Sequence, residues 1–506
     1  MALTRRCFGA LTTASAFLPA IGAAAEPGGI LTVATVGEPP TLDPMASTAD
    51  LVGMITQHIF ETLYTFDKNW AVTPLLAAAL PDVSADGRTV TINLRTGVTF
   101  HDGSAMSSAD VLASLRRWAT LATRGRQTAP QIAGIEAPDA ATIRITLKQP
   151  YAPLPALLAF NNSAAIIIPA VNIASPLTAI IGTGPYKLRE RKPDQYIQLV
   201  RFDAYASPPG APDGYGGGRH PLLDEIRFIP VPDAATRVAS AAAGQYHYAD
   251  SLPVEAFDRF KGSVPIVLKP FGWPQIVMNT KQGMFTSLAL RRAVQTALSP
   301  EDMLAAAFGS KEFYAVDGAL YPPGYVWNTG AGVARYGDAD PEAAAKLVKQ
   351  AGYDGRPLRL LTSRQYEFHY KMAQVAEAYL KQAGFKLDLQ VTDWATLTQR
   401  RAEPALWDIF ITHSPFLPEP ALTGFMADDS PGWWSTPQKD AAVSAFNRET
   451  DPAKRVQLWA QVQTLFYQEA PAFKVGDFNT LSARSTKLAG FVPAPWPYFW
   501  NASLTA

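Results

Sequence analysis

The sequence is poor in cysteine and has no excess of charge of either sign. Cys7 is the only cysteine among 506 residues, and it lies in an N-terminal stretch that we expect to be removed. We therefore expect no disulfide, thiolate metal site or cysteine nucleophile in the mature chain. Lys and Arg number 44, and Asp and Glu also number 44, so the net charge is zero. This balance argues against a nucleic-acid-binding protein, which normally carries a basic excess.

Long apolar runs are missing as well. Beyond the N-terminus, no run reaches the roughly 18 residues that a membrane-spanning helix needs. Apolar residues still make up 48% of the chain and charged residues 17%, which suffices for a large core and excludes global disorder. At about 100–200 residues per domain, the length predicts two or three domains.

The motifs of several enzyme classes are absent. We find no Gly-x-Ser-x-Gly elbow, no His-Glu-x-x-His pair and no phosphate loop. The run Gly182-Thr183-Gly184-Pro185 lacks the third glycine of a dinucleotide fingerprint, so we expect a tight turn before a strand. No two of the six histidines are spaced i, i+4 on a predicted helix, so we expect no metal and no cofactor. His369 and His413 are the pair whose segments could converge across a cleft.

The N-terminus reads as an export signal covering residues 1–25. Adjacent Arg5 and Arg6 precede a mildly apolar stretch, and Ala25 ends a run of small residues suited to signal peptidase. The arginine pair favours the twin-arginine route, with an ordinary secretory signal as the alternative. Cys7 precedes the apolar stretch, so it is not a lipid-anchoring cysteine. We expect cleavage after Ala25 and a periplasmic product that is not a lipoprotein.

Helix caps and alternating strands recur along the rest of the chain. Apolar residues alternate with polar ones around residues 90–94 and 143–147, which predicts half-buried strands. Capping patterns at Ser107, Ser299, Asp340 and Asp451 predict four helix starts. A further helix over residues 372–384 is followed at once by a strand over 385–391. This mixture predicts a layered α/β or α+β protein, with a loose surface loop over residues 207–221.

Five motifs follow one another in a recognisable order. The longest is Leu94-Arg95-Thr96-Gly97-Val98-Thr99-Phe100-His101-Asp102-Gly103. The others are Gly37-Glu38-Pro39-Pro40-Thr41-Leu42-Asp43-Pro44, Gly182-Thr183-Gly184-Pro185-Tyr186, Leu290-Arg291-Arg292-Ala293-Val294 and Asp340-Pro341-Glu342-Ala343-Ala344. Together they resemble the bacterial extracellular solute-binding protein family 5, the dipeptide, oligopeptide and nickel-binding group of ABC importers, and the longest is similar to the most specific family signature. The resemblance covers roughly residues 30 to 500.

The resemblance implies a two-lobed α/β fold of the periplasmic-binding-protein type II class (cluster C), with an extra subdomain inserted in the first lobe. Lobe I would comprise residues 30–64, 184–271 and 478–506, and the inserted subdomain residues 65–183. Lobe II would comprise residues 272–477. Because the lobes are discontinuous, two crossings of the chain would form a hinge.

The implied function is that of a periplasmic substrate-binding subunit of an ABC importer. Such a subunit would trap a peptide or peptide-like solute between closing lobes and deliver it to the membrane permease and ATPase. Ligand binding would supply the free energy for closure, so no covalent chemistry is needed. We expect a monomer that does not bind nucleic acid.

In peptide binders of the family, an acidic residue after the strand matching residues 407–412 takes the amino terminus of the peptide. Here that position looks like Phe416 or Leu417, and the nearby Glu419 matches a structural position further on. A buried ammonium without an anionic partner costs several kcal/mol. The departure argues against dipeptides with a free amino group.

Other candidate ligand contacts also rest on the resemblance. The hydroxyls of Ser47 and Thr48 match an early cleft segment, although a capped surface turn is the alternative. Arg364, next to Tyr366, lies where some members bind a carboxylate, which a guanidinium suits; a solvated arginine is the alternative. Five aromatic residues and one histidine complete the set, either as cleft walls or as core: Trp273, Trp394, Phe416, Trp433, Trp434 and His413. Of these, the pair Trp433-Trp434 is expected to be the most exposed.

Alternatives remain open at this point. The ligand could instead be an opine, a sugar or an amino-acid conjugate, and less readily nickel or haem, because no clustered histidine or thiolate supports them. A chemotaxis sensor would share the fold. A secreted hydrolase on a two-lobed scaffold is the distant rival, and it would need a catalytic constellation in the cleft.

Overall fold

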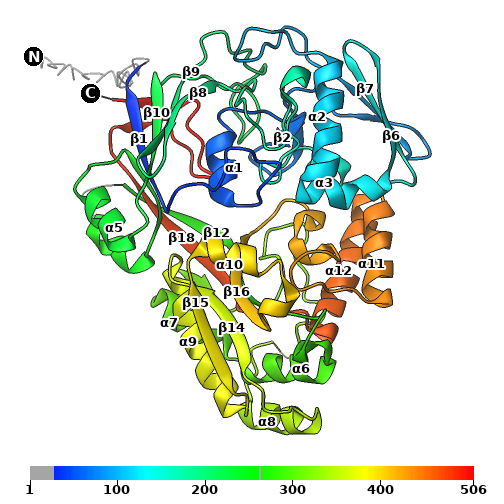
Figure 1. Ribbon diagram of the computed structural model, residues 1–506, viewed down its shortest axis with the longest axis vertical. Helices are drawn as coiled ribbons and strands as arrows, with labels where there is room; N and C mark the ends of the chain where they lie inside the picture. Colours follow the sequence, from blue (N-terminus) through cyan, green and yellow to red (C-terminus); the bar gives the residue numbers. More distant parts are fainter. Residues whose placement is uncertain (1–27, 261–263, 335, 506) are drawn as a thin grey trace, which may run out of the picture.

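The computed structural model describes residues 28–260, 264–334 and 336–505 (Figure 1). The predicted signal over residues 1–25 lies outside this part of the chain. Two α/β lobes share one 12-stranded sheet, in which ten strands follow the order β15-β14-β16-β12-β18-β11-β1-β10-β9-β8, with β13 and β17 pairing beside it. No helix in the described part is long and apolar enough to cross a membrane.

The upper lobe in Figure 1 carries one end of this sheet. Strand β1 runs parallel to both β10 and β11, whereas β8, β9 and β10 form antiparallel pairs. Two helices, α1 and α5, belong to this lobe. The bounds are β1 Ile30–Thr35, α1 Asp50–Thr56, β8 Tyr186–Lys192, β9 Tyr196–Arg201, β10 Glu225–Pro230, α5 Ala234–Ala242 and β11 Tyr248–Leu252.

A subdomain inserted in the upper lobe has its own antiparallel sheet, in the order β4-β5-β7-β6. The two strands predicted by alternation are β5 and β7, which pair with each other. Helix α2 begins with a capping box at Ser107, where the sequence predicts a helix start. The Ser107 side chain caps the backbone N–H of Asp110, and the Asp110 side chain accepts the backbone N–H of Ser107. The bounds are β2 Tyr64–Phe66, β3 Val72–Pro74, β4 Asp82–Val83, β5 Thr89–Asn93, α2 Ser108–Leu121, α3 Thr123–Thr128, β6 Ile132–Asp139, β7 Thr142–Leu147 and α4 Leu154–Leu157.

The lower lobe carries the other end of the sheet, where β14 pairs in parallel with β15 and β16. The predicted caps at Ser299, Asp340 and Asp451 are confirmed, because each side chain accepts a backbone N–H three residues on. The bounds are α6 Leu288–Ala297, α7 Pro300–Phe308, β13 Tyr314–Ala315, α8 Pro341–Gln350, β14 Leu358–Ser363, α9 Glu367–Gln382, β15 Leu387–Thr392, α10 Trp394–Arg400, β16 Ile409–Pro415, α11 Pro437–Arg448, α12 Pro452–Glu469 and β17 Ala472–Lys474.

Two strands cross from one lobe to the other. Strand β12, Val264–Met278, pairs with β18, Asp477–Arg484, along its first part and with β16 along its second. The register between β12 and β18 shifts between Leu268 and Gly272, where β12 passes from one partner to the other. The predicted architecture of two α/β lobes and an inserted subdomain is confirmed, while the residue boundaries stay a prediction. The last short strands are β19, Leu488–Ala489, and β20, Ser503–Leu504.

The glycines of Gly182-Thr183-Gly184-Pro185 are needed for close backbone contact. A Cβ added at Gly182 would lie 2.1 Å from the carbonyl oxygen of Ile59, and one at Gly184 would lie 2.5 Å from that of His58. The Gly184 N–H donates to the Ile59 carbonyl at 2.9 Å, just before β8 begins. The run is therefore a tight turn before β8, as the sequence predicts, and it is anchored to the segment that follows α1.

We expect Gly182→Ala to lower the free energy of unfolding by about 2 kcal/mol, because the new methyl group must displace backbone at residue 59. Urea denaturation followed by circular dichroism measures this loss. Gly134→Ala in β6 is the matched control, since nothing lies within 4 Å of its added Cβ. Equal stability of the two variants would contradict the packing argument.

Candidate functional site

Two of the large cavities between the lobes meet at one wall. Their empty volumes are about 1090 and 1640 Å³. Asp50 and Trp496 from the upper lobe and His413 from the lower lobe line both cavities. These three residues therefore divide one interlobe cleft into two compartments.

The smaller cavity, the aromatic compartment, is walled by aromatic rings and carries the charged side chains of Arg237 and Asp250 on the upper-lobe side. The rings are those of Tyr248, Phe271, Phe308, Tyr366, Phe368 and Phe478. The larger cavity, the arginine compartment, combines charged, hydroxyl and indole groups. Its lining includes Thr48, Arg124, Arg401, Thr412, Leu417, Trp433 and Trp434. One end of the cleft thus favours apolar groups and the other favours charge.

Asp50 is the carboxylate shared by the two compartments. Its Oδ1 atom accepts hydrogen bonds from Trp496 Nε1 at 2.9 Å and from Asn162 Nδ2 at 3.1 Å. Burial raises the pKa of Asp50, although these two bonds and the charges of Arg124 and Arg401 oppose the rise. The bonds leave Oδ2 free for another partner within the part of the chain described.

Arg124 and Arg401 lie in the arginine compartment on opposite lobes. Arg124, in α3, donates from Nη2 to the Leu422 carbonyl at 3.0 Å, and its buried Nε has no hydrogen-bond partner among the described residues. Arg401, directly after α10, donates no side-chain hydrogen bond in the described part of the chain; its guanidinium lies 6.0 Å from the Phe410 ring centroid. Burial lowers the pKa of each guanidinium to about 10, which leaves both charged at neutral pH.

Arg237 and Asp250, the charged pair of the aromatic compartment, differ from each other in their hydrogen-bond partners. Arg237 is saturated by backbone carbonyls, including those of Val231 at 2.7 Å and Ser251 at 2.8 Å, so its role is structural. The Asp250 carboxylate accepts from the Ser251 hydroxyl at 3.0 Å, and burial raises its pKa. Asp250 is therefore, with the shared Asp50, a buried acidic group that this compartment presents to a ligand.

His369 and His413 meet, as the sequence suggested, but on one lobe instead of across the cleft. His369 Nε2 lies 2.9 Å from His413 Nδ1, so one proton is shared between them. The rings of Tyr366 and Trp394 pack around the pair. Burial lowers the pKa of His413 to about 4 and that of His369 well below 6.5, so both imidazoles are neutral at neutral pH. No group of three or more potential metal ligands occurs among the described residues.

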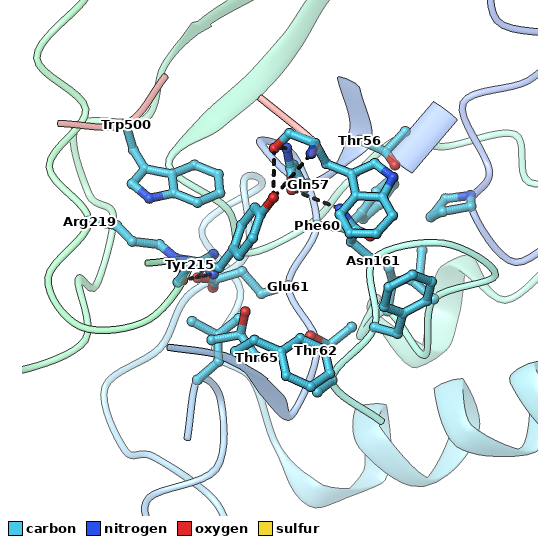
Figure 2. Close-up of a pocket in the computed structure, with 18 of the residues that line it drawn as sticks. Thr56, Gln57, Phe60, Glu61, Thr62, Thr65, Asn161, Tyr215, Arg219 and Trp500 are labelled. Carbon is cyan, nitrogen blue, oxygen red and sulfur yellow. Dashed lines mark hydrogen bonds and ion pairs between the residues drawn. The ribbon is translucent and has the colours of Figure 1, made fainter. Parts of the chain in front are cut away.

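A smaller cavity of about 510 Å³ lies inside the upper lobe, behind Phe160 and Trp496, which separate it from the arginine compartment. Figure 2 shows Gln57 on one side of this cavity and Thr62 and Thr65 on another. Gln57 Nε2 donates to the carbonyls of residues 496 and 497, and Asn161 donates to Gln57 Oε1 at 3.0 Å. These bonds fix the wall between the inner cavity and the cleft.

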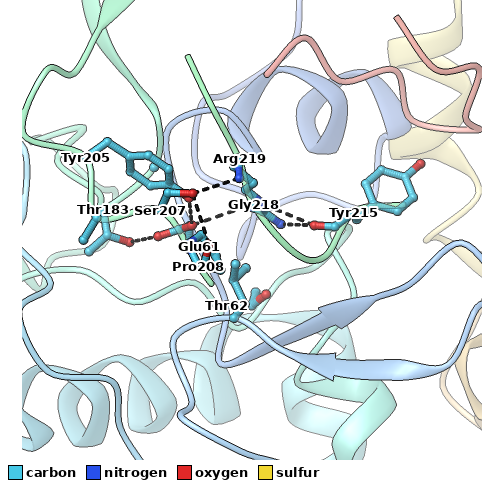
Figure 3. Close-up of polar contacts among 12 residues, drawn as sticks. Glu61, Thr62, Thr183, Tyr205, Ser207, Pro208, Tyr215, Gly218 and Arg219 are labelled. Atoms are coloured by element: carbon cyan, nitrogen blue, oxygen red, sulfur yellow. Dashed lines mark hydrogen bonds and ion pairs between the residues drawn. The ribbon is translucent and has the colours of Figure 1, made fainter. Parts of the chain in front are cut away.

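Glu61, on the floor of that cavity, belongs to a closed polar network (Figure 3). Its carboxylate accepts from Tyr205 at 2.7 Å and from Thr183 at 2.9 Å, and Arg219 lies 3.4 Å away. The Arg219 guanidinium also donates to the Tyr215 carbonyl at 2.7 Å and stacks 4.3 Å from the Trp500 ring. Both charges here have partners, so the network offers no free group to a ligand.

Contacts between the lobes close the cleft at two rims. At one rim Lys371 of α9 forms an ion pair with Glu255. At the other rim the Ala152 N–H donates to the Asn447 carbonyl at 2.9 Å, and Gln127 donates to Asp429 at 3.3 Å. These contacts are few and mostly exposed, so each stabilises closure only weakly.

Six of the predicted contact residues line the cleft: Thr48, Tyr366, His413, Leu417, Trp433 and Trp434. The expectation that both adjacent tryptophans are exposed is wrong for Trp434. Its ring is 2% exposed, because its Nε1 donates to Glu469 at 2.6 Å within the lower-lobe core. Trp433 is half-buried and stacks on Trp407, with ring centroids 5.6 Å apart.

The other five predicted residues do not line either compartment. Ser47 accepts the Ala49 N–H and caps the turn before α1. Trp273 and Phe416 are core residues, 3% and 2% exposed. Arg364 is exposed and lies 4.2 Å from the Tyr370 ring, and Trp394 covers the histidine pair from outside. A direct role for these five in ligand binding stays a prediction.

The predicted absence of an acid after β16 matches the geometry. Phe416 and Leu417 bring no charge, and both Glu419 oxygens are held by Arg455 at 2.8 and 2.9 Å.

Four charged residues that line the cleft were not predicted from the sequence: Asp50, Arg124, Asp250 and Arg401. Asp50 lies two residues after the predicted Thr48, so its segment was found. The other three lie far apart in the sequence, and only folding brings them together.

The two-lobed α/β architecture is that of the periplasmic-binding-protein type II class, which the solved structures similar to this chain share. A model of the bacterial extracellular solute-binding proteins, family 5 (middle region), matches residues 71–460. The chain belongs to this family.

Known proteins resemble the chain over most of its length. One relative, from Sinorhizobium fredii, is named probable peptide ABC transporter periplasmic-binding protein y4tO. It is 28% identical to this chain, over 91% of this chain and 90% of its own length. The glutathione-binding protein GsiB of Salmonella choleraesuis is 27% identical over 89% of both chains. AgaA from A. tumefacien R10, solved with agropinic acid, shares the fold with a TM-score of 0.82 at 24% identity, over 94% of this chain and 99% of its own.

We expect the histidine pair to weaken the fold in acid. An unfolded histidine has a pKa near 6.5 and folded His413 one of about 4, so between these values the unfolded state binds more protons. Stability is therefore full above about pH 6.5 and is lost as the pH falls toward 4. At pH 5 the loss attributable to His413 is about 2 kcal/mol.

Urea unfolding at pH 7 and pH 5 tests this expectation. The His369→Gln/His413→Gln double variant should lose less stability between the two pH values than the unmodified chain. His220→Gln, which removes an exposed imidazole from the upper lobe, is the control. An unchanged pH dependence in the double variant would contradict the expectation.

Proposed function

We propose that this protein is the exported substrate-binding subunit of an ABC importer, which traps a peptide or peptide-like solute between its lobes and presents it to a membrane permease and ATPase. The observation that carries the proposal is the cleft itself, because ligand-facing groups from both lobes converge on one enclosed space. A solute that contacts both lobes favours the closed form over the open one.

Export to the periplasm follows from the same proposal. The names of two relatives, a periplasmic-binding protein and a glutathione-binding protein, fit a chain that works outside the cytoplasm. We further propose that the chain acts as a monomer without a cofactor and is not an enzyme. The buried carboxylate Glu61 is locked in its network, and His413 pairs with a second histidine, not with a nucleophile.

A non-peptide ligand is the second candidate, and one observation favours it. The position after β16 has no acid, and Glu419 is committed to Arg455, so no lower-lobe carboxylate there can take a peptide ammonium. The buried upper-lobe acids Asp50 and Asp250 are the carboxylates best placed to replace it. An opine or an amino-acid conjugate with a masked amino group would avoid this need.

Thermal melting of residues 26–506 with separate panels tests the proposal. One panel holds di- to pentapeptides and glutathione, and the other holds agropinic acid, other opines, sugars and amino-acid conjugates. A ligand at about 100 times its Kd adds about 2.7 kcal/mol of stability, which raises the midpoint measurably. A shift in either panel supports a solute-binding subunit and selects its class, whereas no shift in both contradicts the proposal.

Restoring an acid after β16 gives a sharper test of the peptide class. We expect Leu417→Asp not to weaken the binding of a free dipeptide such as Ala-Leu, and to strengthen it where the ammonium lies in the arginine compartment. Leu417→Asn, which has the same shape without the charge, is the matched control. Isothermal titration calorimetry measures both, and a dipeptide affinity lost only in the Asp variant would contradict the expectation.

A further inference from the structure

The inner cavity, the space of about 510 Å³ inside the upper lobe, is almost closed off from solvent. Its lining residues are all buried except Trp70 and Asn161, which are half-buried. Its size lies within the range of small-molecule pockets. Because Phe160 and Trp496 separate it from the cleft, its interior is a space of its own.

Aromatic rings form most of the wall of the inner cavity. They belong to Phe60, Phe66, Trp70, Phe160, Tyr215, Trp496 and Trp500. The two charged lining residues, Glu61 and Arg219, are committed to each other and to the network in Figure 3. A charged molecule would therefore find no counter-ion here, whereas a flat neutral molecule would bury its surface against the rings.

Two lining residues carry polar atoms that no described residue satisfies. Gln57 Nε2 donates to two backbone carbonyls, so its Oε1 accepts from Asn161 Nδ2 at 3.0 Å. This orientation leaves the Asn161 Oδ1 atom buried without a donor. Trp500 is 1% exposed, and its Nε1 is buried without an acceptor in the described part of the chain. Buried polar atoms normally have a partner in the protein, in water or in a ligand.

Trp70 is the ring of the lining that also reaches the surface. It lies at the tip of the β2–β3 hairpin with a φ of 64°, a left-handed conformation that bulky residues rarely adopt. Asp67 Oδ1 fixes this turn by accepting the N–H groups of Asn69 and Ala71, each at 2.8 Å. The turn thereby holds the Trp70 ring centroid 5.9 Å from that of Tyr215. Strained residues of this kind are frequent where a protein holds a ligand.

We propose that the inner cavity is a second binding site, separate from the cleft, for a small neutral aromatic molecule that carries one N–H or hydroxyl group. The rings of the lining pack against its flat body, and its polar group donates to Asn161 Oδ1. A hydroxyl group could in addition accept from Trp500 Nε1. This site goes beyond the proposed function, because it does not depend on which solute the cleft binds.

Trp496 is the side chain that the inner cavity and the cleft have in common. Its carbonyl accepts from Gln57 Nε2 and from the Tyr215 hydroxyl, each at 3.1 Å, and both donors line the inner cavity. Its Nε1 donates to Asp50 on the cleft side at 2.9 Å. A molecule in the inner cavity therefore packs against the back of the wall that shapes both compartments of the cleft.

Calorimetric titration of residues 26–506 with indole and benzofuran tests the proposal. The two probes have nearly the same shape, but benzofuran has no N–H group. We expect indole to bind at one site with a Kd below about 1 mM, and benzofuran to bind at least about threefold more weakly. Neither benzoate nor benzylammonium should displace indole. Displacement by either ion, or no indole binding at millimolar concentration, overturns the proposal.

Two matched substitutions separate the inner cavity from the cleft. Ala164→Leu fills the inner cavity, because Ala164 is buried there and lines neither compartment of the cleft. We expect it to weaken indole binding at least about tenfold. Ala234→Leu narrows the aromatic compartment and should stay within about threefold of the unmodified protein. Asn161→Leu should remove the preference for indole over benzofuran. The reverse response of the two alanine variants would place indole in the cleft and overturn the proposal.

A crystal structure of the unmodified protein with 5-bromoindole decides the location even where a variant fails to fold. We expect an anomalous bromine peak in the inner cavity. A peak only in the cleft, or no peak at all, overturns the proposal. The melting panels that test the proposed function contain peptides, opines, sugars and conjugates, and no small neutral aromatic molecule. Failure of those panels therefore leaves the inner site standing, and failure of indole leaves the proposed function standing.

Discussion

The crossing of β12 and β18 between the lobes is the constraint on which the rest of the structure depends. Both strands belong to the shared sheet, so the lobes are tied by backbone hydrogen bonds and not by a flexible linker. The register shift before Gly272 marks the place where β12 exchanges one partner for another. Gly272 has no side chain there because a Cβ would lie 2.0 Å from the Ser414 carbonyl oxygen. The shared strands hold the two walls of the cleft opposite each other.

Electrostatic pairing separates the structural interior from the cleft. In the lobes, buried charges are matched, as between Arg219 and Glu61 or Arg455 and Glu419. In the cleft the matching is incomplete: Arg401 has no acid within hydrogen-bonding distance, and Asp50 is held by neutral donors. Arg401 is half-buried, so water or a solute in the cleft can complete the pairing that the protein leaves open. The rims add few contacts of their own, so the occupant of the cleft has a large effect on the balance between open and closed forms.

The fold was predictable from the sequence because its signals are local. The caps at Ser107, Ser299, Asp340 and Asp451 and the glycine turn at Gly182 each act within a few residues, and all appear where expected. The lack of an acid after β16 could also be read from the chain. The cleft could not be read in full, because Arg124 and Arg401 are 277 positions apart and become neighbours of Asp50 only by folding. The prediction for Trp434 was wrong because its neighbours in the sequence are typical of an exposed loop. Folding places its side chain in the core, where it donates a hydrogen bond to Glu469.

The wall of Asp50, His413 and Trp496 gives the cleft two chemically distinct ends. A solute that fills both ends meets mainly aromatic rings at one end and arginine, hydroxyl and indole groups at the other. The linings of the two ends share only these three positions, so a substitution at one end leaves the lining of the other largely unaltered. The two ends can therefore change independently, and a lineage could alter the groups accepted at one end while keeping those accepted at the other.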